Sequence, residues 1–123
     1  MAEINLDDSA IVNITCSKAN TFGPLMLKLA VKDSDPKEYY DLTGWLFSMK
    51  VRWTSDDPNV LFEFTGNEIT GNSSGQIIIT KAYSLMAVVE QGFYQYDLIA
   101  FKPDGTRYAL IKGYLKVNDA VSE

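Results

Sequence analysis

Carboxylates are the side chains best able to do chemistry in this sequence, because the chain has no histidine and a single cysteine, Cys16. Asp33, Asp35 and Glu38 follow one another closely and could form a calcium loop. The segment lacks the glycine, the spacing and the terminal bidentate glutamate of an EF-hand loop, so a solvated acidic turn is the simpler interpretation. Without histidine, the commonest general base and zinc ligand are missing. We therefore predict no metal site and no bound cofactor.

A hydrolase that cleaves glycosidic bonds needs two carboxyl groups about 5 to 10 Å apart in a cleft. The candidates are scattered along the chain with no supporting pattern: Asp41, Glu63, Glu90 and Asp97. Cys16 lies in an alternating apolar segment, and we interpret it as a small core residue rather than a reactive thiol. We predict no catalytic residue and no enzymatic activity.

Length and composition indicate one soluble domain. The 123 residues suit a single domain, and a hydrophobic content of 46% suffices for a core without metal or disulfide bonds. The net charge of -5 argues against nucleic-acid binding, which usually needs a basic surface. No apolar run is long enough to span a bilayer and the first residues lack a signal-peptide pattern, so we expect a protein made in the cytosol with no membrane partner.

Alternation of apolar and polar residues predicts strands over 10–16, 25–31 and 45–54. We also expect a short strand over 60–64 and an apolar, β-branched strand over 76–80. In the third segment one face is strongly apolar, and we expect it in the core: Trp45, Phe47, Met49, Val51 and Trp53. The other face carries Leu46, Ser48, Lys50 and Arg52. Residues 81–89 have the apolar spacing of a short helix. We predict a flexible arm over 1–9, one domain over 10–118 and a tail over 119–123.

The segment 92–117 is typical of a long β-hairpin, with two aromatic strands joined by a turn at 103–105. Pairing Lys102 with Thr106 predicts two faces, and a register slip of one residue would exchange the faces of the second strand. One face comprises Tyr94, Tyr96, Leu98, Tyr108, Leu110 and Tyr114. The other comprises Phe93, Ile99, Phe101, Ala109, Ile111 and Leu115. Neither face is polar.

Two apolar faces on one hairpin indicate that one packs in the core and that the other contacts another molecule. The predicted protein interface comprises Phe93, Ile99, Phe101, Ala109 and Ile111. The alternative is that a helix or loop of the same chain covers this second face.

The number and spacing of strands favour an all-β fold, an antiparallel immunoglobulin-like β-sandwich of about seven strands with one short helix. Gly92, Tyr94 and Tyr96 have the spacing of a tyrosine corner, in which a tyrosine hydroxyl binds backbone a few residues upstream. The alternative is that both tyrosines are ordinary strand aromatics.

Several segments resemble the small β-sandwich domains of tailed-phage baseplate and tail-fibre adaptor proteins, such as the N-terminal domain of baseplate upper proteins. The resemblance covers about residues 40–118 and lies in Asp-Leu-Thr-Gly at 41–44, Gly-x-Tyr-x-Tyr-Asp-Leu at 92–98, Pro-Asp-Gly-Thr at 103–106 and Leu-x-x-Gly at 110–113. It implies a non-enzymatic virion part that is bound many times over in a symmetric assembly. A baseplate protein of that kind would continue into a stalk beyond Glu123, which suggests a stand-alone adaptor, fibre-attachment or capsid-surface protein.

We therefore expect a structural protein of the virion, made in the host cytoplasm, whose partners are other virion proteins and copies of itself as a homo-oligomer. The alternative is a carbohydrate- or host-surface-recognition module in which Trp45, Trp53 or exposed tyrosines stack on sugars. The alternation over 45–54 buries both tryptophans, which argues against that alternative.

Overall fold

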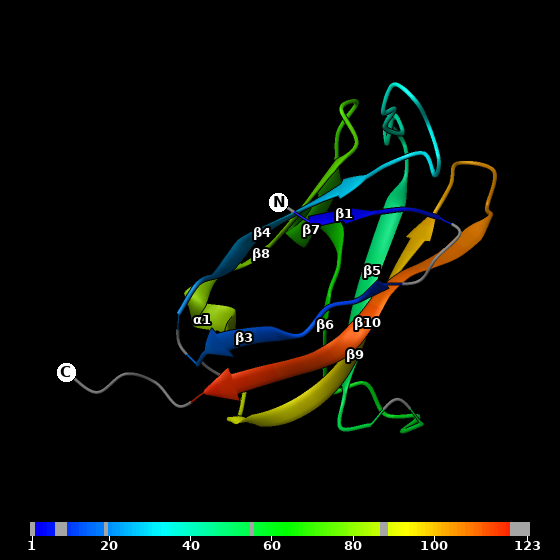
Figure 1. Ribbon diagram of the computed structural model, residues 1–123. Coiled ribbons are helices and arrows are strands. Elements are labelled where there is room, and N and C mark those ends of the chain that lie inside the picture. The colour runs from blue at the N-terminus through cyan, green and yellow to red at the C-terminus, as the bar shows by residue number, and fades with distance from the viewer. Residues whose placement is uncertain (1, 7–9, 19, 55, 87–88, 119–123) are drawn as a thin grey trace.

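Strands in two sheets make up most of the computed structural model, which describes residues 2–6, 10–18, 20–54, 56–86 and 89–118 (Figure 1). Sheet A has the strand order β1-β4-β8-β7, with β1 at Ala2–Ile4, β4 at Phe22–Leu29, β8 at Gln76–Lys81 and β7 at Ile69–Gly71. In this sheet β1 runs parallel to β4, and the other pairs are antiparallel. The expectation of an all-β chain is confirmed.

Sheet B has the strand order β2-β10-β9-β5-β6, and β3 also pairs with β10. Its strands are β2 at Ala10–Ile11, β3 at Ile14–Ser17, β5 at Leu46–Arg52, β6 at Phe62–Phe64, β9 at Gly92–Phe101 and β10 at Arg107–Asn118. The long β9–β10 hairpin and its turn lie where the sequence predicted them, since Lys102 and Thr106 pair across the turn. Both β2 and β3 run parallel to β10.

Two N-terminal expectations differ from the structure. Residues 2–4 were expected in an arm outside the fold, but they form β1, because Ile4 is buried against the core. The strand expected over 10–16 is interrupted at Val12 and Asn13 and therefore appears as β2 and β3. Short strands such as these raise the number in the described residues to ten, above the expected seven. Residues 7–9 and 119–123 of the expected arm and tail lie outside the described residues.

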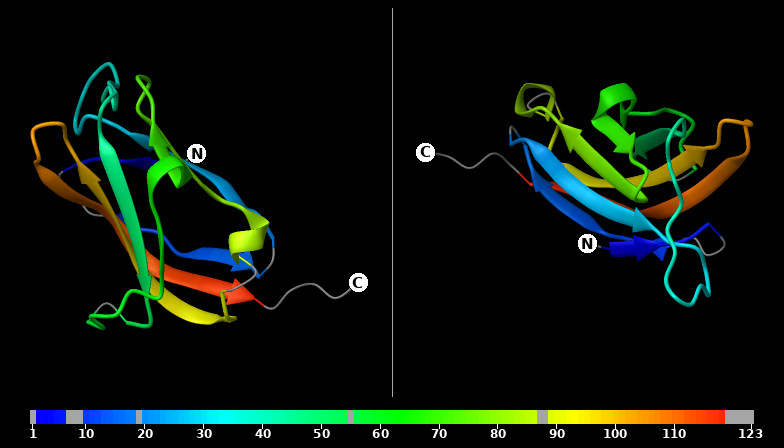
Figure 2. Two further views of the ribbon diagram at one scale, coloured as in Figure 1. Left: turned by 180° about the vertical axis from the view of Figure 1, so that it is seen from behind. Right: turned by 90° about the horizontal axis from the view of Figure 1, so that it is seen from above.

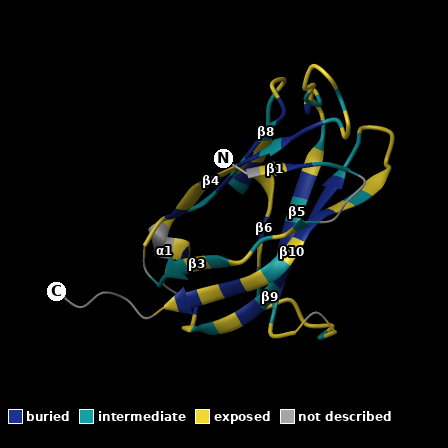
Figure 3. Cartoon of the chain, in the orientation of Figure 1, coloured by how far each residue is buried: buried dark blue, intermediate teal, exposed yellow. Residues whose placement is uncertain are grey.

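One apolar core lies between the two sheets, which Figure 2 shows as two layers. Sheet A contributes Leu27, Leu29, Ile77 and Ile79, and sheet B contributes Met49, Val51, Leu98 and Leu115, all fully buried. These residues alternate along their strands with more exposed ones, because successive side chains of a strand point to opposite faces (Figure 3). The alternation predicted from the sequence is therefore the physical origin of the two-layer arrangement.

The short helix expected over 81–89 is α1, at Tyr83–Met86. Met86 is fully buried, so the helix closes one end of the core between β8 and β9. Residues 87 and 88 of the expected helix lie outside the part of the chain that the structure describes.

A β-bulge in β10 changes which side chains share a face. The register of β10 on β9 shifts between Ala109 and Ile111, so Leu110 is an extra residue. Both Leu110 and Ile111 then belong to the core, and every later residue of β10 is displaced by one position relative to simple alternation. Consequently Ile111 and Leu115 face the core and Tyr114 faces outward, which is the reverse of the faces predicted from the sequence.

Candidate functional site

The side of sheet B that faces away from the core is the surface on which the predicted interface falls, and we call it the outer face. Its residues come from alternate positions of the central strands, which appear as bands along β10 in Figure 3. Strand register aligns them in rows across β5, β9 and β10: Leu46, Phe101 and Arg107; Ser48, Ile99 and Ala109; Lys50, Asp97 and Lys112; Arg52, Gln95 and Tyr114; and finally Phe93 with Lys116.

Four of the five predicted interface residues lie on the outer face. Phe93 is 62% exposed, Ala109 is exposed and Phe101 is half-buried. Ile99 is only 7% exposed between Ser48 and Ala109, so it is part of the floor of this face. Ile111 is 1% exposed on the core side, and its assignment to the outer face is wrong because of the bulge at Leu110. The interface itself stays a prediction.

Sequence reasoning missed three exposed apolar residues of this surface. Leu46 is 70% exposed, Ile11 of β2 is 71% exposed, and Tyr114 is 52% exposed. The alternation over 45–54 already placed Leu46 opposite the apolar face, so that signal was available in the sequence. Tyr114 could not be found in this way, because its orientation depends on the bulge.

A row of alternating charges divides the outer face. Glu63 of β6 is opposite Lys50, Lys50 is opposite Asp97, and Asp97 is opposite Lys112. Arg52 Nη1 also lies 3.7 Å from Asp97 Oδ1, and both side chains are partly exposed. Opposite charges on neighbouring strands attract each other modestly. The expectation that neither hairpin face is polar is therefore wrong for the middle of the outer face, and its ends carry both apolar and basic side chains.

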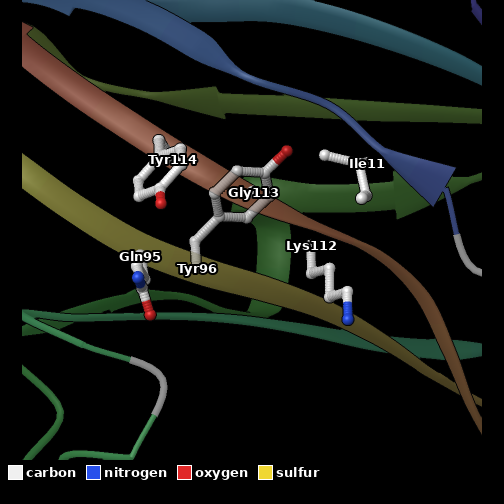
Figure 4. A pocket seen from close by; sticks show the side chains of 6 residues that line it. All are labelled: Ile11, Gln95, Tyr96, Lys112, Gly113 and Tyr114. Carbon is white, nitrogen blue, oxygen red and sulfur yellow. The ribbon is translucent and has the colours of Figure 1, made fainter.

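A shallow hollow of about 240 Å³ lies beside the charged row, lined by Ile11, Gln95, Tyr96, Lys112, Gly113 and Tyr114 (Figure 4). The Tyr96 hydroxyl donates a 2.6 Å hydrogen bond to the backbone carbonyl of Val12, and burial raises the pKa of this phenol well above its usual value. Gly113 is opposite Tyr96 in the sheet. A Cβ at Gly113 would overlap the carbonyl oxygen of Val12, so only glycine fits.

A second hollow, of about 290 Å³, lies at one end of the core and is lined by Trp53, Leu61, Phe62, Val89, Glu90 and Tyr94. Trp53 was expected in the core but is 47% exposed. The reason is its position one residue beyond the end of β5, where one face of its ring stacks on Tyr94 at 4.8 Å while much of the rest remains in solvent. Trp45 is half-buried against the core beside Tyr40, as expected.

Tyr94 forms the predicted tyrosine corner. Its hydroxyl donates a hydrogen bond to the backbone carbonyl of Glu90, four residues upstream, and thereby ties β9 to the connection that precedes it. Burial, with the charge of Glu90, raises the pKa of Tyr94. The alternative of an ordinary strand aromatic is wrong for Tyr94.

The other candidate carboxylates do not converge. Glu63 and Asp97 are separated by Lys50 on the strand between them, and Asp41 accepts hydrogen bonds from the backbone and hydroxyl of Thr43, which lower the pKa of its carboxyl. Among the described residues no three metal-ligating side chains gather at one point. Cys16 is half-buried against the core, and burial raises the pKa of its thiol.

Within the described part of the chain, no helix has both the length and the apolar character that a membrane crossing requires.

Comparison with known proteins gives likenesses to solved structures only. No family model matches the sequence, and none of the curated proteins matches it. Among solved structures, the chain is similar to one described as "Structures of Clostridium thermocellum CbhA fibronectin(III)-like modules", with a TM-score of 0.35 and 12% sequence identity. That alignment covers 98% of this chain and 100% of the other.

Proposed function

We propose that this protein is a non-enzymatic structural component of a tailed-phage particle, which acts by protein–protein assembly through the outer face of sheet B. The observation that carries the proposal is the exposure of Ile11, Leu46, Phe93 and Tyr114 on that face, where each is more than half exposed. Leu46 lies on one side of the charged row, and Phe93 and Tyr114 lie on the other. Large apolar side chains left exposed on one face of a sheet often mark an interaction site. The charged row across the middle of this face would add orientation rather than affinity, because complementary charges fix the register of an interface.

The virion part of the proposal is supported by the resemblance of four sequence segments to baseplate and tail-fibre adaptor domains. In this chain, three of those segments form β9, its turn and the bulged part of β10, and the fourth leads into β5. The resemblance thus concerns the strands that build the outer face. We assign the chain to the virion, with other virion proteins and copies of itself as partners.

We also propose that the two-sheet fold is of the immunoglobulin-like type. The tyrosine corner at Tyr94 is a feature of such sandwiches. An N-terminal strand that pairs in parallel with the last strand, as β3 does with β10, agrees with that arrangement.

Light scattering over a range of protein concentrations tests the assembly role. We expect the wild-type chain to form oligomers, and Leu46→Asp and Phe93→Asp to abolish them without a change in thermal unfolding. Met26→Asp is a matched control, because Met26 is an exposed apolar residue of β4 in sheet A. Ile99→Asp is unsuitable, since a buried charge at this position would destabilise the fold itself.

The assembly role is overturned if the outer-face variants are incorporated normally into particles and oligomers. The genes that flank this one test the virion assignment. Neighbours that encode phage head or tail proteins support it, and a setting among unrelated metabolic genes contradicts it.

A carbohydrate- or host-surface-recognition module is the second candidate function, and the exposure of Trp53 favours it. The ring lies at the edge of a hollow with Leu61 and Phe62, where a sugar ring could stack on it. Binding of a monomer to a glycan array, lost in Trp53→Ala and retained in Phe93→Asp, would support recognition. Absence of glycan binding by the wild-type chain would remove this candidate.

A further inference from the structure

We propose that the partner of the outer face is a second copy of this chain, bound face to face across a two-fold axis that runs parallel to the strands of sheet B. This inference rests on the proposed assembly function and specifies its geometry. The observation behind it is the charge order across the sheet, which is negative, positive, negative, positive from Glu63 through Lys50 and Asp97 to Lys112.

A two-fold axis along the strands reverses the order of the strands in the facing copy and keeps each row in place. The row from Glu63 to Lys112 then faces the same row of the second copy in the opposite order. Glu63 faces Lys112 of the second copy, and Lys50 faces Asp97 of the second copy. Each of these contacts occurs twice, so the row is complementary to itself along its whole length.

Two other rows bring apolar side chains together under the same operation, and Arg52 faces the neutral Gln95 of the second copy. Leu46 faces Phe101 of the second copy, which joins two apolar side chains at one end of the outer face. At the other end, Leu61 faces Tyr114 of the second copy. Leu61 immediately precedes β6 and donates its backbone N–H to the carbonyl of Val51, which places it beside β5. Leu61 and Tyr114 are 41% and 52% exposed, so both would lose solvent contact in the dimer.

The charge order also disfavours a two-fold axis that crosses the strands at the charged row. Such an axis keeps the strand order, so that Glu63 meets Glu63 and Lys50 meets Lys50 of the second copy. Like charges facing each other in this way cost several kcal/mol. The alternating row therefore selects the axis parallel to the strands.

The size of the outer face indicates the strength of the dimer. Strand spacing and rise per residue give an outer face of roughly 20 by 27 Å, which amounts to about 1,000 Å² for the two copies together. This area lies below that of standard stable interfaces, so we expect a weak dimer that exchanges with monomer. Charged pairs at its centre make the association weaker at high salt.

Charge reversal at one position of each facing pair tests the arrangement by sedimentation equilibrium. Lys50→Glu places Glu opposite Asp97 of the second copy, and Asp97→Lys places Lys opposite Lys50, so each variant alone is expected to dimerise more than tenfold more weakly than wild type. In an equimolar mixture the two variants complement each other, and heterodimers should form. Lys37→Glu should leave dimerisation unchanged. It changes the net charge by the same amount as Lys50→Glu, but it lies on the loop at 31–38.

A second pair keeps the test valid if one of these variants folds poorly. Glu63→Lys and Lys112→Glu are both exposed and face each other under the same axis. Restored association in either mixture supports the proposal. If wild type self-associates but neither mixture does, the axis is wrong while the assembly function stands. If wild type remains a monomer at millimolar concentration, the second copy is not the occupant, and the assembly function then depends on the particle-incorporation test.

Discussion

Tyr96 donates its hydroxyl hydrogen bond to the backbone carbonyl of Val12, which is 84 residues earlier in the chain, at 2.6 Å. The contact lies beside Gly113, the residue opposite Tyr96 on β10. This hydrogen bond lies where the N-terminal strand is interrupted between β2 and β3. There it gives the Val12 carbonyl a donor in place of the backbone pairing that a continuous strand would supply. The phenol therefore adds a side-chain contact to the backbone pairing that holds β2 and β3 against the hairpin.

Replacing Tyr96 with Phe should lower the free energy of unfolding by about 1 kcal/mol, because the half-buried carbonyl of Val12 loses its donor. Urea denaturation followed by fluorescence measures the change. Tyr114→Phe is the control, since this side chain is exposed, and its effect should stay within about 0.5 kcal/mol. Equal stabilities of the two variants would contradict the role of the Tyr96 hydroxyl.

Stability should decline at alkaline pH, and Tyr96 should account for part of the decline. Burial raises the pKa of Tyr96 in the folded state above the value of about 10 in the unfolded chain. Above that pH the unfolded state releases a proton that the folded state retains, so the free energy of unfolding falls as pH rises. Denaturation curves at pH 8 to 11 should show a smaller decline for Tyr96→Phe than for wild type. Parallel curves for the two proteins would show that this phenol is not the titrating group.

Gly113→Ala should detach the N-terminal strands from β10. The added Cβ would overlap the carbonyl oxygen of Val12, and backbone cannot move aside as easily as a side chain. We expect a loss of about 2 kcal/mol or more, with faster hydrogen exchange at 14–17. Gly105→Ala is the comparison: no atom lies close to its Cβ position, so its cost is limited to the positive φ of the turn.

Ile111→Ala and Phe93→Ala should have opposite consequences, although the sequence predicted both side chains on one face. Ile111 is in the core, and its truncation should cost about 2–5 kcal/mol in thermal or chemical unfolding. Phe93 is exposed, so its truncation should change stability by less than about 0.5 kcal/mol and act on association instead. A stable Ile111→Ala protein would mean that the bulge at Leu110 is misplaced.

Local patterns were enough to predict much of this protein. The alternation over 45–54 and the β-branched run over 76–80 predicted strands that the structure contains. The turn at 103–105 predicted the hairpin, and the spacing of Gly92 and Tyr94 predicted the tyrosine corner. These features depend on residues close together in the chain, where side-chain period and turn chemistry decide the conformation. The predicted interface was correct in placing Phe93, Phe101 and Ala109 on the outer face for the same reason.

The sequence by itself thus determined a β-rich chain with a long aromatic hairpin and one face of that hairpin outside the core. Only the tertiary structure decided that Ile111 is buried and Tyr114 exposed. The extra residue at the bulge can be recognised only from the pairing of β10 with β9, because the sequence alternates in the usual way before it and after it. The same holds for Trp53, whose exposure depends on where sheet B ends, and for the charged row, whose members come from four strands. Pairing between distant segments brought Glu63, Lys50, Asp97 and Lys112 into line, and that register is a property of the folded sheet.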